Sequence, residues 1–168
     1  MKRKVDGNFN CEENKLISLE WSPKYVGGDF DCQDNKLTLL EGAPEEVGGS
    51  FDCSHNRLTS LEGAPKIVGG NFNCHTNRLT SLEGAPKIVG GSFDVEWNNL
   101  KSLKGAPEWV RGDFICSRNH LSSLDGAPKR VDGDFMCWFQ WNDEVRSYVR
   151  VFTEEEVRSV CKVGGSII

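Results

Sequence analysis

Six of the seven cysteines in this 168-residue chain recur in one repeated position, where thiols could form disulfides, bind zinc or lie in a core. The six are Cys11, Cys32, Cys53, Cys74, Cys116 and Cys137. Val95 stands where the pattern requires a further cysteine. A small buried apolar site tolerates valine, whereas a disulfide or a metal site does not. We therefore predict that these thiols are reduced and belong to the core.

Catalytic constellations are scarce in the sequence. It contains no phosphate-binding G-x-x-x-x-G-K-[ST], no H-E-x-x-H and no glycine-flanked serine nucleophile. His55 and His75 fall in adjacent columns of the repeat, but zinc would need two further ligands, and the only candidates are acidic side chains such as Asp52 or Glu96. We therefore predict a protein that is not an enzyme, with no catalytic residue, no metal site and no cofactor.

A surface for a macromolecular partner is the stronger candidate. Side chains alternate across a strand, so the residues that flank the repeated Phe and Cys positions point outward, onto the expected concave face. These columns are small and acidic in the early copies and become apolar and aromatic in the late ones. Exposed aromatic side chains beside an arginine are typical of an interface hot spot. The predicted partner-binding residues are Asp94, Glu96, Trp97, Ile115, Arg118, His120, Met136 and Trp138.

Trp97 and Arg118 occupy one column in successive copies of the repeat. Neighbouring strands of a sheet lie about 5 Å apart, so we expect the guanidinium of Arg118 to stack on the indole of Trp97.

The elements that position these residues come from seven copies of a 21-residue repeat, which begin at Val5, Val26, Val47, Val68, Val89, Val110 and Val131. Such a period predicts a solenoid, in which each coil buries its apolar side against its neighbours. Phenylalanine fills one column completely and the cysteine column lies two residues later, which predicts a short strand with one buried face.

The rest of the coil can be assigned column by column. Asparagine, from Asn14 to Asn119, follows three residues after each cysteine position and predicts an inward ladder that satisfies backbone groups. Two leucine columns complete the core. All six prolines share one column, so this leg is extended or turned, and a glycine pair such as Gly48-Gly49 leads into the next strand.

The run F-x-C-x-x-N-x-L-x-x-L, over residues 5 to about 140, resembles the leucine-rich repeat L-x-x-L-x-L-x-x-N-x-L. It is most similar to the short-repeat bacterial and bacteriophage kinds, whose repeats also carry a proline after the last leucine. The apolar residue before the strand, for example Val47, stands four rather than three residues before the phenylalanine. The predicted fold is a β-rich solenoid over residues 1–142, a leucine-rich-repeat-like right-handed stack of parallel strands, with a parallel β-helix as the alternative.

The repeat breaks after Cys137, where Gln140 replaces asparagine. From residue 143 the apolar residues fall at helical spacing, and Thr153 with Glu156 has the spacing of a capping box. We therefore predict a two-helix cap over residues 143–168. The alternative to partner binding for the last aromatic residues is packing beneath these helices. The residues concerned are Trp138, Phe139 and Trp141.

Charge and composition restrict the classes of partner. The net charge is −5, and residues 1–52 hold 6 of the 20 Lys and Arg but 11 of the 25 Asp and Glu. This distribution argues against nucleic acid, which requires a basic face. The sequence shows neither a signal peptide nor an apolar run of membrane-spanning length, so we predict a cytoplasmic protein without membrane contact.

The predicted function is a non-enzymatic protein-protein interaction module that binds one partner through its concave face. The resemblance to bacteriophage repeat proteins implies a phage-encoded inhibitor of a bacterial host protein, such as a defence factor, in the host cytoplasm. Two alternatives stay open. One is a small-molecule or nucleotide binder that uses the late aromatic residues, and the other is a structural unit that forms a weak homodimer through its uncapped N-terminal strand.

Overall fold

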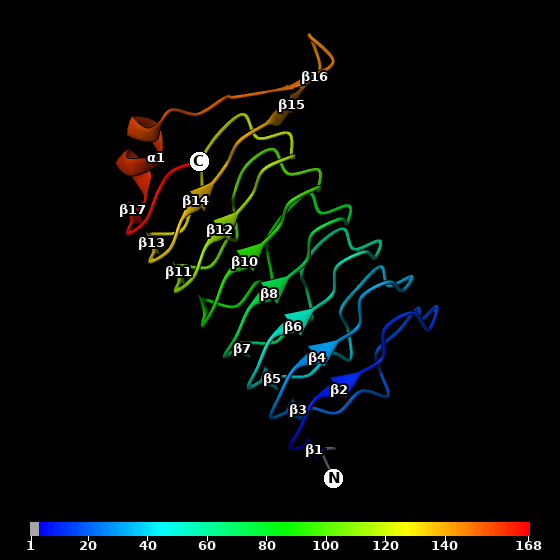
Figure 1. Ribbon diagram of the computed structural model, residues 1–168. Coiled ribbons are helices and arrows are strands. Elements are labelled where there is room, and N and C mark those ends of the chain that lie inside the picture. Colours follow the sequence, from blue (N-terminus) through cyan, green and yellow to red (C-terminus); the bar gives the residue numbers. More distant parts are fainter. Residues whose placement is uncertain (1–3) are drawn as a thin grey trace.

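The computed structural model describes residues 4–168, which form a parallel β-solenoid with its first and last coils at opposite ends of the stack (Figure 1). Each of the seven repeats contributes two short strands, one to each of two parallel sheets. The sheet that we call the Val sheet contains β1 (Lys4–Val5), β3 (Tyr25–Val26), β5 (Glu46–Val47), β7 (Ile67–Val68), β9 (Ile88–Val89), β11 (Trp109–Val110), β13 (Arg130–Val131) and β17 (Lys162–Val163). The sheet that we call the Phe sheet contains β2 (Phe9–Asn10), β4 (Phe30–Asp31), β6 (Phe51–Asp52), β8 (Phe72–Asn73), β10 (Phe93–Asp94), β12 (Phe114–Ile115) and β14 (Phe135–Met136).

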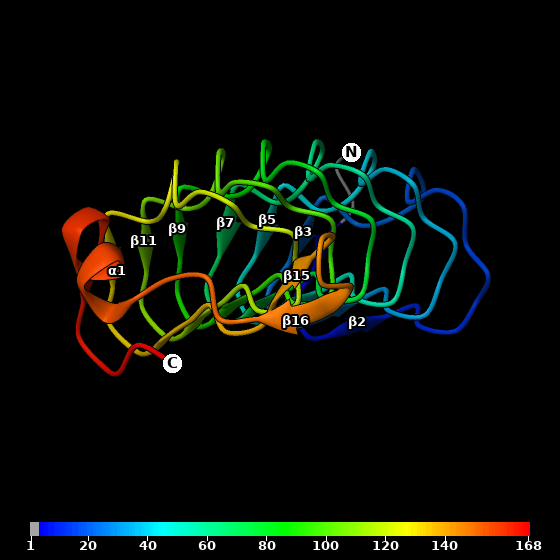
Figure 2. The same cartoon turned by 90° about the horizontal axis from the view of Figure 1, so that it is seen from above.

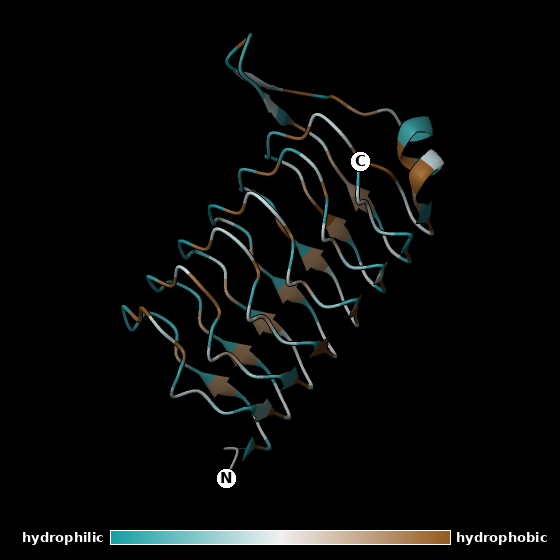
Figure 3. Cartoon of the chain, turned by 180° about the vertical axis from the view of Figure 1, so that it is seen from behind, coloured by the Kyte–Doolittle hydropathy of each residue, from teal (hydrophilic) through white to brown (hydrophobic). Residues whose placement is uncertain are grey.

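The register of both sheets follows the repeat. Val26 pairs with Val5 and with Val47, and Phe30 pairs with Phe9 and with Phe51 in the same way. Each column of the repeat therefore becomes a row of side chains that stack along the solenoid. Figure 3 shows the hydrophobic and hydrophilic residues of each coil separated along these rows.

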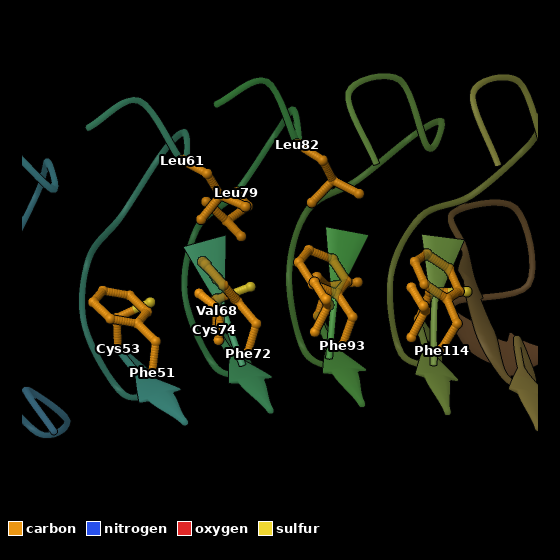
Figure 4. Close-up of a cluster of buried hydrophobic side chains, with 14 of the residues drawn as sticks. Phe51, Cys53, Leu61, Val68, Phe72, Cys74, Leu79, Leu82, Phe93 and Phe114 are labelled. Atoms are coloured by element: carbon orange, nitrogen blue, oxygen red, sulfur yellow. The ribbon is translucent and has the colours of Figure 1, made fainter. Parts of the chain in front are cut away.

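The core is built from the Phe, Cys, Leu and Val rows (Figure 4). Neighbouring phenylalanine rings lie 5.0 to 5.8 Å apart between centroids, from Phe9 to Phe135. All seven cysteines are free and buried, which confirms the prediction of core thiols, and Val95 in their row is fully buried. Burial raises the pKa of the Cys11, Cys137 and Cys161 thiols to about 11.

The predicted asparagine ladder is confirmed. The side-chain amide of Asn56 donates to the carbonyl oxygens of Cys32, Cys53 and Ser54 at 3.0 to 3.2 Å, and its oxygen accepts from the Leu37 N–H at 3.0 Å. Gln140 takes this role in the last coil, where its amide donates to the carbonyls of Cys116 and Cys137. The ladder thus pairs backbone groups that would otherwise be buried without partners.

A second polar ladder, which the sequence analysis missed, runs just before the Phe row. The side-chain oxygen of Asp29 accepts from the Ser50 N–H at 2.7 Å, and that of Ser50 accepts from the Asn71 N–H at 3.1 Å. Only short side chains with an acceptor oxygen occupy this row, which continues through Ser92, Asp113 and Asp134 to Ser166. A Cβ on Gly49 would collide with Asp29 Oδ1, so the second glycine of each pair leaves room for the ladder.

The prediction of two terminal helices is wrong. Within residues 4–168 the only helix is α1 (Glu154–Val160), and its N-terminal capping box between Thr153 and Glu156 is confirmed. The preceding segment forms an antiparallel hairpin of β15 (Gln140–Asn142) and β16 (Ser147–Val149). Trp141 and Tyr148 are directly opposed in it, with ring centroids 5.3 Å apart. Cross-strand aromatic pairing of this kind stabilises a hairpin, and here it overrides the helical period.

The expected boundary at residue 142 does not mark the end of the solenoid. β17 pairs with β13, and the Ser166 N–H donates to Asp134 Oδ1 across 32 residues instead of 21. The hairpin and α1 are therefore an insertion in the last repeat, after which the chain returns to both sheets. Figures 1 and 2 agree that α1 lies at the C-terminal end near the Val sheet and that the hairpin lies apart from it.

Candidate functional site

The outer face of the Phe sheet changes character along the stack. Phe114 and Phe135 point into the core, so the residues that follow them in β12 and β14 point outward. Asp94, Ile115 and Met136 are register partners in this outer row. Ile168 extends the row, because Ile167 forms a bridge with Phe135 and the Cys137 N–H donates to the Ile168 carbonyl at 2.7 Å.

A hollow of about 240 Å³ opens at this end of the Phe sheet. It is lined by Glu96, Ser117, Arg118, Met136, Trp138, Phe139 and Ile168. Four of the predicted partner-binding residues contribute to the lining, and the structure adds Ser117, Phe139 and Ile168. The sequence does contain a signal for Ile168, because the Val-Gly-Gly-Ser of residues 163–166 repeats the start of the earlier coils.

The other four predicted residues lie outside the lining of the hollow. Trp97 stacks with Arg118, which is part of the lining. Asp94 and Ile115 precede Met136 in the outer row. His120 is not part of this face. It follows the Asn ladder on the leg toward Leu121, and its N–H donates to the Leu100 carbonyl at 2.9 Å.

Residues with a left-handed backbone conformation form one row of the repeat beside the site. Trp97, Arg118 and Phe139 have φ values of 54°, 53° and 57°, and the equivalent residue of every earlier coil is also left-handed. This conformation costs a residue with a Cβ about 1 kcal/mol or more. Trp97 and Phe139 remain 46% and 45% exposed, so both keep apolar surface that a partner could cover.

The predicted stacking of Arg118 on Trp97 is confirmed. The guanidinium carbon lies 5.0 Å from the centroid of the indole ring. The same guanidinium forms an ion pair with Glu96, with 2.7 Å between Nη1 and Oε1. Both side chains are partly exposed, so this ion pair contributes little to stability. It does orient the guanidinium of Arg118.

The hairpin brings further aromatic side chains to the edge of the site. The ring of Tyr148 meets Trp97 edge-on at 5.7 Å, and the guanidinium of Arg150 lies 5.5 Å from the ring of Trp138. Trp141 packs on Tyr148, so the terminal segment does cover part of Trp138 and Trp141, whereas Phe139 stays exposed. The Nε1–H of Trp138 is buried and has no acceptor among the described residues.

Burial also affects the acidic part of this face. It raises the pKa of Asp94, an effect opposed by the hydrogen bond that its carboxylate accepts from the Glu96 N–H at 2.9 Å. Asp31 behaves similarly, since burial raises its pKa and the neighbouring carboxylate of Asp52 raises it further. The outer row thus contains carboxylates that a cationic partner would stabilise in their charged form.

Among residues 4–168, no three or more His, Cys, Asp or Glu side chains are placed to hold a metal ion. The rings of His55 and His75 contact each other edge-on at 5.1 Å. Within the same residues, no helix is long and apolar enough to cross a membrane.

Comparison of the chain with models of known protein families, with characterised proteins and with solved structures gave no match. The function must therefore be argued from the geometry of this face.

Proposed function

We propose that this protein is a non-enzymatic module that binds a partner protein against the late coils of the Phe sheet. The observation that carries the proposal is the hollow of about 240 Å³ with Met136, Trp138, Phe139 and Ile168 in its wall. Apolar and aromatic side chains around a hollow on an exposed sheet face gain free energy when a partner covers them, at roughly 25 cal/mol per Å² of apolar surface.

The arrangement supports an anchor-and-rim mode of binding. An apolar side chain of the partner fills the hollow, and the Arg118–Glu96 ion pair lies at its rim. Arg118 is already oriented by Glu96 and Trp97, so little side-chain entropy is lost when a partner hydrogen-bonds to it.

The early coils contribute long-range attraction. The columns one, three and four residues after the repeated phenylalanine contain seven carboxylates and one cation, Arg118. The carboxylates are Glu12, Glu13, Asp31, Asp34, Asp52, Asp94 and Glu96. A partner with a basic patch would be steered toward this face, an effect that acts on the association rate more than on the final affinity.

We further propose that the solenoid is of the leucine-rich-repeat kind and that the partner is a bacterial host protein, inhibited in the cytoplasm by a phage-encoded binder. The resemblance of the repeat and the asparagine ladder support this assignment. Pairing of the Val row into a second parallel sheet is the feature that favours the alternative, a parallel β-helix.

A nucleotide ligand is disfavoured because the guanidinium of Arg118 is already paired with Glu96.

The test begins with capture of the partner. The immobilised full-length protein is exposed to bacterial lysate, bound proteins are identified by mass spectrometry, and the affinity of the purified partner is measured by calorimetry. We expect Trp97→Gly combined with Arg118→Glu to weaken binding by about 30-fold or more, as hot-spot substitutions do.

The matched control changes the early coils. Asp31→Asn with Asp52→Asn, in a row where other coils already have asparagine, should lower the association rate and its salt dependence while leaving the dissociation rate nearly unchanged. If the early pair abolishes binding and the late pair does not, the partner recognises the acidic coils and the proposal is wrong.

A further inference from the structure

The outer face of the Val sheet carries a second exposed apolar site. The first residue of each strand points outward, because the valine that follows it is buried. Ile67 and Ile88 occupy adjacent positions in this row and are 55% and 47% exposed. They line a hollow of about 360 Å³ together with Lys66, Lys87 and Arg111. The lining also includes Gly69 and Gly90, where a Cβ would collide with the backbone of the preceding coil.

Charge is segregated between the two sheets. The positions beside the Val row, which are the two residues before each valine and the one after it, hold eight cations and five anions over the described residues. The cations are Lys4, Lys24, Lys66, Lys87, Arg111, Lys129, Arg130 and Lys162, and the anions are Asp6, Glu45, Glu46, Glu108 and Asp132. The net charge of this face is thus positive in a chain whose total is −5.

The cations around the hollow exceed the carboxylates available to them. Glu108 lies between Lys87 and Lys129, at 3.3 and 2.7 Å from their Nζ atoms. Asp132 pairs with Arg130 and accepts a hydrogen bond from the indole N–H of Trp109 at 2.9 Å.

Neither Lys66 nor Arg111 forms a direct ion pair with a carboxylate of residues 4–168, although Arg111 interacts electrostatically with Asp132. The guanidinium of Arg111 instead lies 4.7 Å from the ring of Trp109, beside the hollow. Two cations without a direct ion pair, Lys66 and Arg111, therefore surround an apolar floor together with Lys87, which shares Glu108 with Lys129.

We propose that this hollow binds a short acidic peptide segment of a partner protein, with an apolar side chain over Ile67 and Ile88 and carboxylates on Lys66, Lys87 and Arg111. Charge complementarity identifies the chemistry, because carboxylates would give Lys66 and Arg111 the direct ion pairs that they lack. The apolar strip is one residue wide and lies in a concavity, which an extended side chain can fill. A bilayer surface is flat and would contact only the rim, so a membrane is the weaker occupant.

This site is independent of the proposed function, since it lies on the other sheet and shares no residue with the hollow near Trp138. Loss of one binding activity would leave the other testable in the same protein.

The test uses methyl-labelled isoleucine in the full-length protein and a synthetic peptide, acetyl-Glu-Leu-Glu-Glu-Leu-Glu-amide. Titration should shift the NMR signals of Ile67 and Ile88 in a saturable way. Lys66→Glu with Arg111→Glu should raise the dissociation constant about tenfold or more. A peptide with Gln in place of every Glu should bind much more weakly.

Arg57→Glu with Arg78→Glu is the matched control. It changes the net charge equally at two exposed arginines of the leg that follows the Asn ladder, and should leave peptide binding within about twofold of the wild type. Urea unfolding of both double variants checks that each remains folded.

The proposal is overturned if the peptide leaves Ile67 and Ile88 unshifted, if the Gln peptide binds equally well, or if the two double variants lose equal affinity. Vesicles with about 30% anionic phospholipid form a separate arm. Vesicle binding that needs Lys66 and Arg111, without peptide binding, would assign the face to a membrane and overturn the proposal as well.

Discussion

Replacement of Trp97 by glycine and by alanine should give an inverted order of stability. At most exposed positions outside helices and strands, alanine is at least as favourable as glycine, because glycine has more conformational freedom to lose on folding. Trp97 is different, since its φ of 54° lies in the left-handed region that glycine adopts without strain. We therefore expect Trp97→Gly to be more stable than Trp97→Ala.

The magnitudes follow from the contacts of the indole. The stacked guanidinium of Arg118 contributes about 0.5–1 kcal/mol at an exposed site, and the edge-on ring of Tyr148 about 0.5–1.5 kcal/mol. Both substitutions lose these contacts, which is a loss of roughly 1–2.5 kcal/mol. Glycine regains about 1 kcal/mol by relief of the left-handed strain. The free energy of unfolding of Trp97→Gly should thus lie within about 1.5 kcal/mol of the wild-type value. That of Trp97→Ala should be about 1 kcal/mol lower than that of Trp97→Gly.

Urea unfolding followed by circular dichroism measures this difference without relying on the fluorescence of the removed indole. Asn99 provides the control, because it is exposed on a neighbouring part of the coil and is not left-handed. At that position alanine should equal or exceed glycine. If alanine is also the more stable replacement at Trp97, the left-handed row stores no strain and our account of this row fails.

Three further predictions concern the core and its charges. Asn98→Ala removes three donated hydrogen bonds and one accepted hydrogen bond in a buried site and should lower the free energy of unfolding by about 3–5 kcal/mol, whereas Asn99→Ala should change it by less than about 0.5 kcal/mol. A loss below about 1 kcal/mol at Asn98 would contradict the ladder. The buried thiols should react with a thiol reagent only as fast as the protein unfolds, and Cys74→Val should cost less than about 1.5 kcal/mol, so rapid labelling of several thiols in the native state would refute their inward placement. The pKa of Asp94 is raised from its ordinary 3.8 because burial disfavours the carboxylate. The protonated side chain therefore stabilises the fold at low pH, and this stabilisation is lost as the pH rises through the raised pKa. Asp94→Asn should therefore raise stability at pH 7 but not at pH 3, and an equal effect at both values in urea unfolding would count against this cause.

Much of the fold followed from the period of the sequence. When each coil has the same length, in-register stacking converts a column of the repeat into a row in space, so sequence alignment and spatial contact become equivalent. The buried Cys row with Val95, the ladder that contains Asn56, and the stacking of Arg118 on Trp97 could be predicted for this reason. Four of the seven residues that line the late hollow were predicted in the same way.

The period gave no guidance where the repeat ends. Residues 140–152 combine helical spacing of apolar residues with an aromatic pair that suits a hairpin, and the contact of Tyr148 with Trp97 and Trp141 favours the hairpin. Trp97 is supplied by the folded solenoid, so local spacing could not reveal its contact with Tyr148. The pairing of Val163 with the Val sheet could not be predicted either, because it depends on the conformation of the inserted hairpin and helix.

The sequence by itself therefore determined which residues stack on one another along the solenoid, whereas only the tertiary structure decided which rows share a face. Rows become neighbours around the coil through its corners, and the corner after each buried valine contains the glycine pair and the second polar ladder. For this reason the net charge of residues 53–168, which is zero, concealed the basic face near Lys66 and Arg111. Charges that are interspersed along the chain are separated onto two different sheets once the corner between Val68 and Phe72 has formed.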